Sequence, residues 1–500
     1  MTSASTAPPE NVRRDRAVGA VLASAAGDAL GAPHEFGPAL SADTVLGMTG
    51  GGSLGWAPGE WTDDTQTALA VLNPLARGAS GVSLLEDIEM GLLAWKNSKP
   101  RDIGNQTSDV LSAAVRDKQR LADVTAAWQA QNPDRAGNGS LMRTGPVALT
   151  PPSRTDPRLQ LARLASDISA LTHANDDAIE ACVLWTDAIR RAIDAPVSPN
   201  GEMDWVGLVT AGLDLVAEEH RDLWSERLEA CAATEPEEFS SNGWVVHALQ
   251  AALSALVHTG VPTDHPCQHL RLAIERAVRI GDDTDTVAAI TGSLAGAWWG
   301  ATAVPLEWRG VLNGRIDYRT DPLHAGDLDR LARLAFTGGT SGSIGWPAID
   351  SLLPYYQTHF PSQPLAEKLD DWVTVGNVHA LPDQLPKVDA VVSLCRMGRF
   401  DVPSDIEHHV IGLLDTTGAD NPNLGFVLAD TADFVTQCVK DERRVFVHCV
   451  QAQNRTPAVA SAYLVRRRGM DPMAAMDQVE KLTHSRPQPF LAQSVQSLVR

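Results

Sequence analysis

The sequence has few cysteines for its length, and they show no pairing pattern. Six cysteines are spread over 500 residues without a C-x-x-C spacing or the density of a disulfide framework. Such usage excludes a small disulfide-rich secreted scaffold and predicts a reducing, cytoplasmic compartment. The cysteines are Cys182, Cys231, Cys267, Cys395, Cys438 and Cys449.

Basic residues are also scarce. The chain has 41 Lys and Arg against 62 Asp and Glu, which gives a formal net charge of -21. A broad nucleic-acid interface or an anchor on an anionic membrane needs a basic surface, so the composition argues against both partners. A local basic pocket for a phosphate group remains compatible with this charge.

Long hydrophobic runs are missing as well. The apolar run at residues 18–32 is short, is interrupted by Asp28 and is rich in Gly and Ala. It therefore suits a buried helix better than a signal peptide or a membrane span. Residues 1–16, which are polar and contain proline, are expected to form a disordered tail.

Period-two alternation of apolar and polar residues is absent before residue 340, whereas helical spacing recurs there. Leu161, Leu164, Ile168 and Leu171 are one example of this spacing. Residues 17–340 are therefore predicted to form one all-α domain. Because 500 residues exceed the usual size of a single core, a second domain is expected after it.

Composition and pattern change after that first domain. Residues 341–365 are rich in Gly, Ser, Pro and aromatic residues, which predicts a linker. Residues 366–500 alternate short β-prone runs with helical runs, which predicts an α/β domain with a central sheet. The expected strands cover residues 372–376, 390–394, 409–414 and 445–448. The chain is thus predicted to have a multi-domain fold, all-α followed by α/β.

Two dense acidic clusters stand out in the predicted helical domain. Residues 281–286 carry three carboxylates and two hydroxyls, and residues 62–65 carry a similar set more than two hundred residues earlier. Carboxylates packed this densely repel one another unless a cation or protons neutralise them. We expect the two clusters to meet around Mg²⁺, since oxygen ligands without His or Cys favour a hard cation over zinc.

Helix capping is the simpler interpretation of each cluster. Thr62, Asp63, Asp282 and Asp283 all precede helical runs, and Thr and Asp are favoured as N-caps. A single Asp-Asp-Thr run would most often be a cap. A cap needs only one oxygen acceptor, however, and each cluster supplies at least three.

A third signal is the glycine-rich stretch that runs from Gly137 to Arg143. Its small residues can present successive backbone N–H groups to an anion, although an Asn-Gly pair is more often a simple turn. His173 ends a helical run and taken alone is more often a structural polar residue than a ligand contact.

These motifs together resemble the ADP-ribosylglycohydrolase family over roughly residues 17–340. The resemblance rests on five motifs in the family's order: residues 27–31 with Glu35, residues 59–65, Gly137–Gly139 with Met142 and Arg143, residues 172–173, and residues 283–286. It implies an all-α fold with two Mg²⁺ ions and an ADP-ribosylated protein or small molecule as substrate. The implied metal ligands are Thr62, Asp63, Asp64, Asp283, Asp285 and Thr286, and the implied substrate contacts are Gly137, Asn138, Gly139, Ser140, Met142 and His173.

The resemblance also implies a reaction. Two cations would bind the ribose hydroxyls and activate a water, while Glu35 or an aspartate such as Asp63 or Asp64 takes its proton. The glycosidic bond to ADP-ribose would then break through an oxocarbenium-like sugar. Asp282 departs from the family's usual small residue, so it either perturbs the metal site or faces solvent.

A second signature lies in the predicted α/β domain. Cys449 and Arg455 have C-x5-R spacing between a predicted strand and a helical run that contains Pro457 near its start. A loop curled there would stabilise a thiolate, and Arg455 would hold phosphoryl oxygens bidentately. Cys438 and Arg444 share the spacing but flank charged residues ahead of the strand, so they cannot form this loop.

This second signature resembles the dual-specificity, cysteine-based protein phosphatases over about residues 366–500. The resemblance implies that Cys449 attacks a phosphorylated substrate, that Asp415 is the general acid and that Thr456 assists departure of the thiol. Ala452 stands where that family usually has Gly, and it would be strained if the loop needs a positive φ at this position.

The sequence therefore predicts a Mg²⁺-dependent ADP-ribosyl hydrolase joined to a phosphatase-like module. One alternative is a phosphatase whose helical domain only binds ADP-ribose. Another is a signalling scaffold in which both pockets bind without turnover. The complete set of cluster carboxylates favours the hydrolase, because a binding module would not need both acidic motifs.

Overall fold

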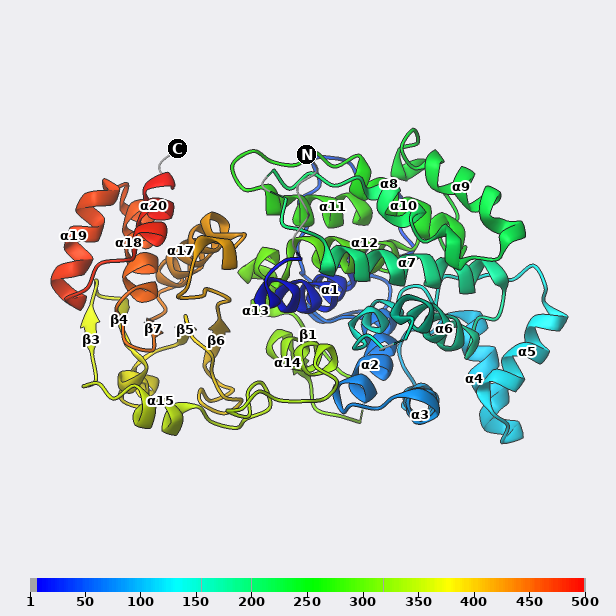
Figure 1. The fold of residues 1–500 in the computed structure, drawn as a ribbon, viewed down its shortest axis with the longest axis horizontal. Coiled ribbons are helices and arrows are strands. Elements are labelled where there is room, and N and C mark those ends of the chain that lie inside the picture. The colour runs from blue at the N-terminus through cyan, green and yellow to red at the C-terminus, as the bar shows by residue number, and fades with distance from the viewer. Residues whose placement is uncertain (1–6, 154, 199, 318, 499–500) are drawn as a thin grey trace. The chain divides into compact units, whose positions relative to one another are not determined.

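The computed structural model describes residues 7–153, 155–198, 200–317 and 319–498, and these residues form two units. Unit 1 comprises Met1–Val304 and Val311–Thr340, and unit 2 comprises Pro305–Gly310 and Ser341–Arg500. Figure 1 shows that unit 1 is built from helices and that the large sheet belongs to unit 2. The predicted change of fold class along the chain is confirmed.

The helical unit is organised around α1 (Glu10–Gly31), which packs along α12 (Thr284–Trp299). Every residue of α12 is buried. A Cβ at Gly27 would lie 2.3 Å from the carbonyl oxygen of Ala288, and one at Gly31 would lie 2.4 Å from the Cα of Asp285. Glycine is therefore required for this close approach, which brings the ends of α1 and α12 that carry the acidic residues together.

The other helices of unit 1 surround this pair. They are α2 (Asp63–Ala76), α3 (Gly81–Asn97), α4 (Asn105–Asp117), α5 (Leu121–Gln131), α6 (Pro157–Ala170), α7 (Asp176–Asp194), α8 (Trp205–Thr210), α9 (Arg221–Ala230), α10 (Val245–Val257), α11 (His269–Val278) and α14 (Ala325–Phe336). A two-residue ladder, β1 (Asn313–Gly314) with β2 (Leu323–His324), was not expected from the helical pattern. No helix among the described residues is long and apolar enough to cross a membrane.

Unit 2 contains a five-stranded sheet in the order β3-β4-β7-β5-β6. Strands β4, β7, β5 and β6 are parallel, and β3 adds to β4 antiparallel. The strands are β3 (Ala366–Lys368), β4 (Val373–Asn377), β5 (Ala390–Ser393), β6 (Glu407–Val410) and β7 (Val445–Cys449). The helices are α13 (Leu306–Val311), α15 (Leu353–His359), α16 (Leu381–Gln384), α17 (Leu424–Lys440), α18 (Arg455–Arg468), α19 (Pro472–Thr483) and α20 (Pro489–Ser497).

Both faces of this sheet are covered, which explains why the inner strands β4, β5 and β7 are buried on both sides, whereas the edge strands β3 and β6 carry charged residues. Val445 and Val447 of β7 pack with residues of α17, α18, α19 and α20. Phe446, which points to the opposite face, packs with Leu352 and with Tyr356 of α15. Cys449 ends β7 at the carboxyl edge of the parallel strands, where α/β proteins usually place their sites.

Three predicted boundaries are wrong. The disordered tail does not extend to residue 16, because α1 begins at Glu10 and buries Val12; residues 1–6 lie outside the described residues. The segment 341–365 is not merely a linker, because Leu352 and Tyr356 enter the core of unit 2. Residues 305–310 belong to unit 2 rather than to the helical unit, because Leu306 is buried in the unit 2 core.

The strand predicted at 409–414 is also misplaced. β6 covers Glu407–Val410, and the backbone leaves the ladder soon afterwards. The N–H of Ile411 still donates to the carbonyl of Ser393, but the N–H of Leu413 donates to the carbonyl of Ile411 in a tight turn. That turn redirects the chain toward Asp415.

Candidate active sites

Asp28 anchors the first acidic loop in unit 1. Its Oδ1 accepts the backbone N–H of Thr62 at 2.8 Å, and its Oδ2 accepts the N–H and the hydroxyl of Thr65 at 2.9 and 2.6 Å. Asp28 is completely buried near the end of α1. It therefore fixes the start of α2, where Asp63 and Asp64 occupy the first turn.

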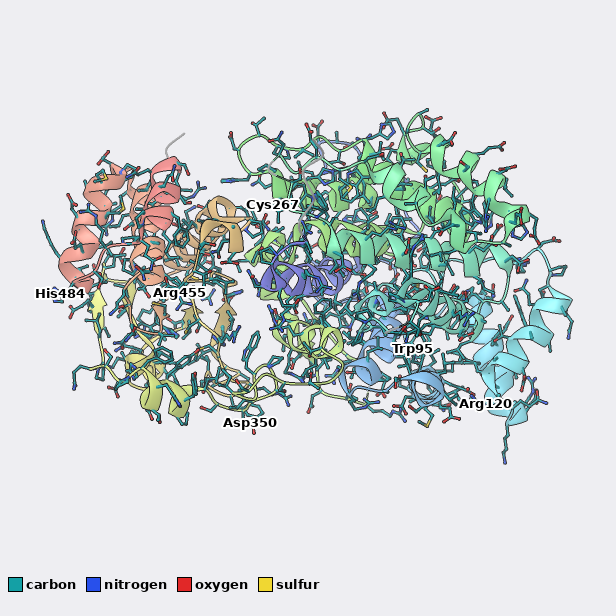
Figure 2. The ribbon with its side chains drawn as sticks, in the orientation of Figure 1. Trp95, Arg120, Cys267, Asp350, Arg455 and His484 are labelled. Carbon is teal, nitrogen blue, oxygen red and sulfur yellow. The ribbon has the colours of Figure 1, made fainter. Side chains whose placement is uncertain are left out.

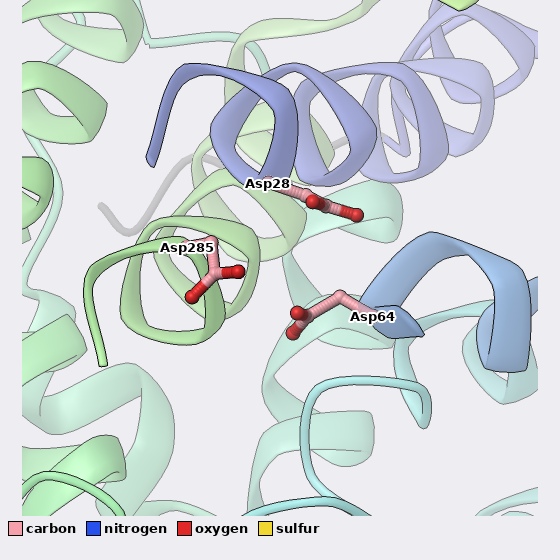
Figure 3. Close-up of side chains that lie close together, drawn as sticks. All are labelled: Asp28, Asp64 and Asp285. Atoms are coloured by element: carbon pink, nitrogen blue, oxygen red, sulfur yellow. The ribbon is translucent and has the colours of Figure 1, made fainter. Parts of the chain in front are cut away.

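The structure brings the two acidic clusters together. The Thr62 hydroxyl lies 3.1 Å from Asp64 Oδ2 and 3.4 Å from Asp285 Oδ2, and the Thr286 hydroxyl lies 3.4 Å from the same Asp64 oxygen. Figure 3 shows the carboxylates of Asp28, Asp64 and Asp285 gathered in one space, from α1, α2 and α12. One oxygen from each lies within 4.8 Å of the others, and Glu35, Asp283 and Asp285 form a second such group.

Capping does not account for the clusters. Thr62 and Asp283 occupy the N-cap positions of α2 and α12, yet within the described chain neither side chain makes a capping hydrogen bond. Asp282 is exposed and has a φ of 57°, and its backbone pairs with Phe36 and Gly37. Of the two outcomes predicted for Asp282, the structure therefore shows the solvent-facing one.

Burial and mutual repulsion raise the pKa values of the buried carboxyls that meet in this centre. Burial is the largest cause for Asp63, Asp64 and Asp285, and neighbouring carboxylates raise each pKa further. Burial, followed by the charges of Asp102, Asp283 and Asp63, raises the pKa of Glu35 to about 10. Without a cation Glu35 therefore retains its proton at neutral pH.

The donor set fits a hard divalent cation. It consists of carboxylate and hydroxyl oxygens, which Mg²⁺ prefers. Asp64 Oδ1 and Glu35 Oε2 are buried and have no hydrogen-bond partner among the described residues. Such acceptors are costly unless a ligand or a proton satisfies them.

Asp102 joins this site although no sequence signal marks it. Its carboxyl shares a hydrogen bond with Glu35, and burial raises its pKa as well. The preceding residue, Arg101, pairs with Glu60 at 2.5 Å and lies 4.5 Å from the ring centroid of Trp56. Arg101 thus attaches the segment that carries Asp102 to the loop that leads into Thr62.

The glycine-rich loop at residues 137–143 is hydrogen-bonded directly to the acidic cluster at residues 281–286. Asn138 Nδ2 donates to Asp283 Oδ2 at 2.7 Å and to the carbonyl of Asn242 at 3.0 Å. Asn242 Oδ1 in turn accepts the backbone N–H of Asp283 at 3.1 Å. Gly137 pairs with Trp244, a residue that is 37% exposed and whose ring lies 4.7 Å from the ring of His247.

His173 lies against this loop as a neutral imidazole. Burial, and then the nearby charge of Arg143, lower its pKa to about 3. Its Nδ1 lies 2.7 Å from the Thr172 hydroxyl, which accepts from Arg143 Nη2 at 2.6 Å. Because the Thr172 hydroxyl already accepts from Arg143, it donates its own proton to Nδ1 of His173. The neutral imidazole therefore carries its proton on Nε2.

The glycine loop has no room for side chains facing His173. A Cβ at Gly139 would lie 3.1 Å from His173 Cε1, and one at Gly137 would lie 3.3 Å from Nε2. The Ser140 hydroxyl is buried against Ser169 and Cys182, so a substrate contact at this residue would use its backbone. Met142 is buried, with its sulfur 3.9 Å from the Thr286 hydroxyl.

The second site lies where β7 meets α18 in unit 2. Cys449 ends the strand and Arg455 begins the helix, as the C-x5-R pattern predicts. Arg455 Nη1 donates to the carbonyl of Leu394 at 2.5 Å, and its Nε lies 3.7 Å from Asp415 Oδ2. Figure 2 labels Arg455 within this unit.

Two residues close to Cys449 in sequence affect the chemistry of this second site. Ala452 has a φ of 57° and is fully buried, so the loop does adopt the conformation that favours glycine there. The Thr456 hydroxyl donates to the carbonyl of Gly376 at 3.2 Å and so has a structural partner on β4.

A family model for ADP-ribosylglycohydrolases matches residues 9–341. The chain belongs to the ADP-ribosylglycohydrolase family. Among its relatives is the ADP-ribosylarginine hydrolase Tri1 of Pseudomonas putida (strain GB-1), which is 31% identical over 314 residues. That alignment covers 61% of this chain and 76% of Tri1.

Two further matches, each over a small part of the chain, are to phosphatases. The protein-tyrosine-phosphatase IBR5 of Arabidopsis thaliana is 44% identical over 52 residues, which cover 10% of this chain and 20% of IBR5. The solved structure of human DUSP28 aligns with 19% identity and a TM-score of 0.25, covering 27% of this chain and 94% of DUSP28.

Proposed function

We propose that unit 1 hydrolyses the glycosidic bond between ADP-ribose and an arginine side chain, with two Mg²⁺ ions as its cofactor. The observation that carries this proposal is the meeting of two Asp- and Thr-rich loops, 222 residues apart at Thr286 and Asp64, in a buried acidic centre. The family assignment and the similarity to an ADP-ribosylarginine hydrolase support it.

The ligands for the two ions come from both loops. They are Thr62, Asp63, Asp64, Asp283, Asp285 and Thr286, while the oxygens of Asp28 are already engaged by Thr62 and Thr65. Bound Mg²⁺ supplies charge that binds ribose oxygens and lowers the pKa of a bound water. Bound cations also lower the pKa values of the cluster carboxyls, so that these groups ionise at neutral pH.

Glu35 and Asp102 act on the proton and the leaving group. Once ionised, Glu35 accepts a proton from the attacking water through its buried oxygen. The C–N bond at the anomeric carbon breaks as the sugar takes on oxocarbenium character. Paired carboxylates match the forked N–H donors of a guanidinium, which favours an arginine leaving group over a serine hydroxyl.

The glycine loop and His173 bind the remainder of the ADP-ribose. Backbone N–H groups from Gly137 to Ser140 suit phosphate or ribose oxygens, and Nε2–H of the neutral His173 adds a donor without adding charge. Asn138 positions the loop through Asp283, and Trp244 offers an aromatic face beside it. The scattered cysteines, which have no pairing pattern in the sequence, fit a cytoplasmic enzyme.

The decisive experiment is release of ADP-ribose from arginine-linked and serine-linked peptides, with Mg²⁺ and with a chelator. We expect Mg²⁺-dependent release that is faster from arginine, and loss of both metal binding and release in Asp285→Ala. Faster cleavage of the serine linkage would contradict the leaving-group assignment. Tight ADP-ribose binding without any turnover would instead identify a binding module.

Unit 2 carries a second proposed activity, hydrolysis of a phosphate ester. The buried Nε of Arg455 has no hydrogen-bond partner among the described residues, which suits a donor that awaits a phosphoryl oxygen. Cys449 Sγ would bond to phosphorus as the ester P–O bond breaks, with Asp415 donating a proton to the leaving oxygen. Water would then release phosphate from the thiol.

Turnover of p-nitrophenyl phosphate tests this second activity. We expect the wild-type protein to release p-nitrophenol and the Cys449→Ser variant to release none. Equal rates from the two proteins would show that Cys449 is not a nucleophile and that unit 2 only binds phosphate or acts as a scaffold.

A further inference from the structure

Two polar side-chain atoms face the same point beside Gly137 in unit 1. A Cβ at Gly137 would lie 3.3 Å from His173 Nε2 and 3.6 Å from Gln106 Oε1. Gln106 is the second residue of α4 and His173 follows α6, so segments distant in the sequence place these atoms together. Gly137 and Gln106 are both partly exposed, which gives a ligand access from solvent.

The backbone carbonyl of Thr172 fixes the direction of the Gln106 amide. Gln106 Nε2 donates to this carbonyl at 3.0 Å. A carbonyl oxygen can only accept, so the amide turns its nitrogen toward Thr172 and its oxygen toward Gly137. Within the part of the chain that the structure describes, Gln106 Oε1 accepts no hydrogen bond. It therefore offers a ligand an acceptor.

The hydroxyl of the same threonine fixes the direction of the imidazole. Thr172 Oγ1 accepts from Arg143 Nη2 at 2.6 Å and lies 2.7 Å from His173 Nδ1. Thr172 is completely buried, and Nδ1 is the one acceptor for its proton among the described residues. Because Nδ1 accepts, the imidazole carries its proton on Nε2, which faces Gly137 as a donor.

A donor and an acceptor that face one point select the group that binds between them. A hydroxyl can accept from His173 Nε2–H and donate to Gln106 Oε1 at the same time. A phosphate oxygen can only accept, so it would satisfy the imidazole but meet the lone pairs of the amide oxygen. The pair therefore favours a sugar hydroxyl over a phosphate oxygen.

We propose that Gln106 and His173 together bind one ribose hydroxyl of ADP-ribose, and that Thr172 is the positioning residue that sets the direction of both side chains. The inference rests on the function proposed for unit 1 and specifies how the pocket beside the glycine loop recognises a sugar. The backbone N–H groups of residues 137–140 then remain for the phosphates. Gln106 lies outside the five motifs that mark the family in this sequence.

Binding of ADP-ribose and of its deoxy analogues, each of which lacks one ribose hydroxyl, tests this assignment. Isothermal titration of the full-length protein in Mg²⁺ measures the dissociation constants. Free ADP-ribose is the product of the proposed reaction, so binding is measured without turnover. A hydroxyl that is bound elsewhere lowers affinity equally in wild type and variants, whereas the hydroxyl bound by Gln106 does not.

Gln106→Met preserves the length of the side chain but removes the acceptor. We expect this variant to bind ADP-ribose about fivefold more weakly, the factor for one hydrogen bond, and to bind one deoxy analogue as wild type does. Thr172→Val should lose a similar factor for ADP-ribose and none for that same analogue. Thr172→Ser restores the hydroxyl and should restore the wild-type constants.

Gln250→Met and Thr125→Val are the matched controls. Gln250 donates its amide to the carbonyl of Arg227 at 2.7 Å, and the Thr125 hydroxyl donates to the carbonyl of Leu171 at 2.6 Å. Both side chains are buried and neither is a proposed contact of ADP-ribose. Their loss should leave every dissociation constant unchanged.

The proposal is overturned if folded Gln106→Met binds ADP-ribose and every deoxy analogue with the same proportional loss, because no single hydroxyl then depends on the amide. Equal losses in Thr172→Val and Thr172→Ser would overturn the role of the Thr172 hydroxyl. Wild-type protein that binds no ADP-ribose would overturn the function proposed for unit 1 as well. Normal wild-type binding without selective loss in the variants would overturn this inference alone.

Discussion

Asp28 Oδ1 accepts the backbone N–H of Thr62 at 2.8 Å, so a residue of the first helix fixes the loop that presents the acidic centre. The same carboxylate accepts two further hydrogen bonds from Thr65. An amide in this place offers one acceptor oxygen and turns an N–H₂ group toward donors. We expect Asp28→Asn to lower the free energy of unfolding by about 2 kcal/mol, as loss of bonds to a charged group does.

The same substitution should weaken Mg²⁺ binding although Asp28 is not a proposed ligand. Urea unfolding measures the stability change, and isothermal titration measures the affinity. Asp282→Asn is the control, because Asp282 neighbours the cluster in sequence but is exposed. Unchanged Mg²⁺ affinity in folded Asp28→Asn would show that the loop holds its shape without this anchor.

The acidic centre should make the metal-free protein less stable as the pH rises. Burial, followed by neighbouring carboxylates, raises the pKa of Glu35 from 4.5 to about 10 in the folded state. Above pH 4.5 the unfolded chain releases this proton while the folded chain keeps it, so stability falls as pH increases toward 10. Asp63, Asp64 and Asp285 shift in the same direction.

Mg²⁺ replaces those protons, so its stabilising effect should grow with pH. Melting temperatures in chelator and in Mg²⁺, compared at pH 6 and pH 8, measure this linkage. The shift caused by Mg²⁺ should be larger at pH 8. A shift of equal size at both pH values would mean that the cation does not displace protons from the cluster.

Sequence patterns predicted the helical and α/β units and the residues of both acidic loops, because these depend on local periodicity and dense motifs. Asp102 could not be found in this way, since it follows no pattern and reaches Glu35 only through tertiary folding. Leu306 was likewise assigned to the helical unit, because nothing local shows that its side chain completes the core of unit 2. Contacts between distant segments decide both cases.

Asp102→Asn should impair cleavage of the arginine linkage more than Mg²⁺ binding. Asp102 shares a hydrogen bond with Glu35 but is not among the proposed metal ligands. The amide of the Asp102→Asn variant cannot accept a charge-assisted hydrogen bond from the guanidinium of the substrate as the Asp102 carboxylate would. The loss of this bond should lower kcat/KM for an ADP-ribosyl-arginine peptide about tenfold or more. Steady-state kinetics and metal titration are compared in the same variant. Loss of Mg²⁺ affinity equal to the loss of activity would place Asp102 in the metal site instead.

Gly139→Ala should disturb the substrate pocket while leaving the acidic centre intact. The new Cβ would lie 3.1 Å from Cε1 of His173, so the imidazole must shift. The hydrogen bond between His173 and Thr172 opposes this shift, because Arg143 in turn bonds to Thr172. We expect an activity loss of about tenfold, less than the roughly hundredfold that a full 1 Å misplacement can cost.

The Mg²⁺-induced shift in melting temperature should remain at its wild-type value in Gly139→Ala, because neither His173 nor Gly139 is a proposed ligand. Gly104→Ala is the matched control, since its Cβ would meet no atom closer than 4.0 Å and activity should be retained. Full activity in Gly139→Ala would show that the loop does not bind substrate against His173. A lost Mg²⁺ response would instead mean that the loop supports the acidic centre through Asn138 and Asp283.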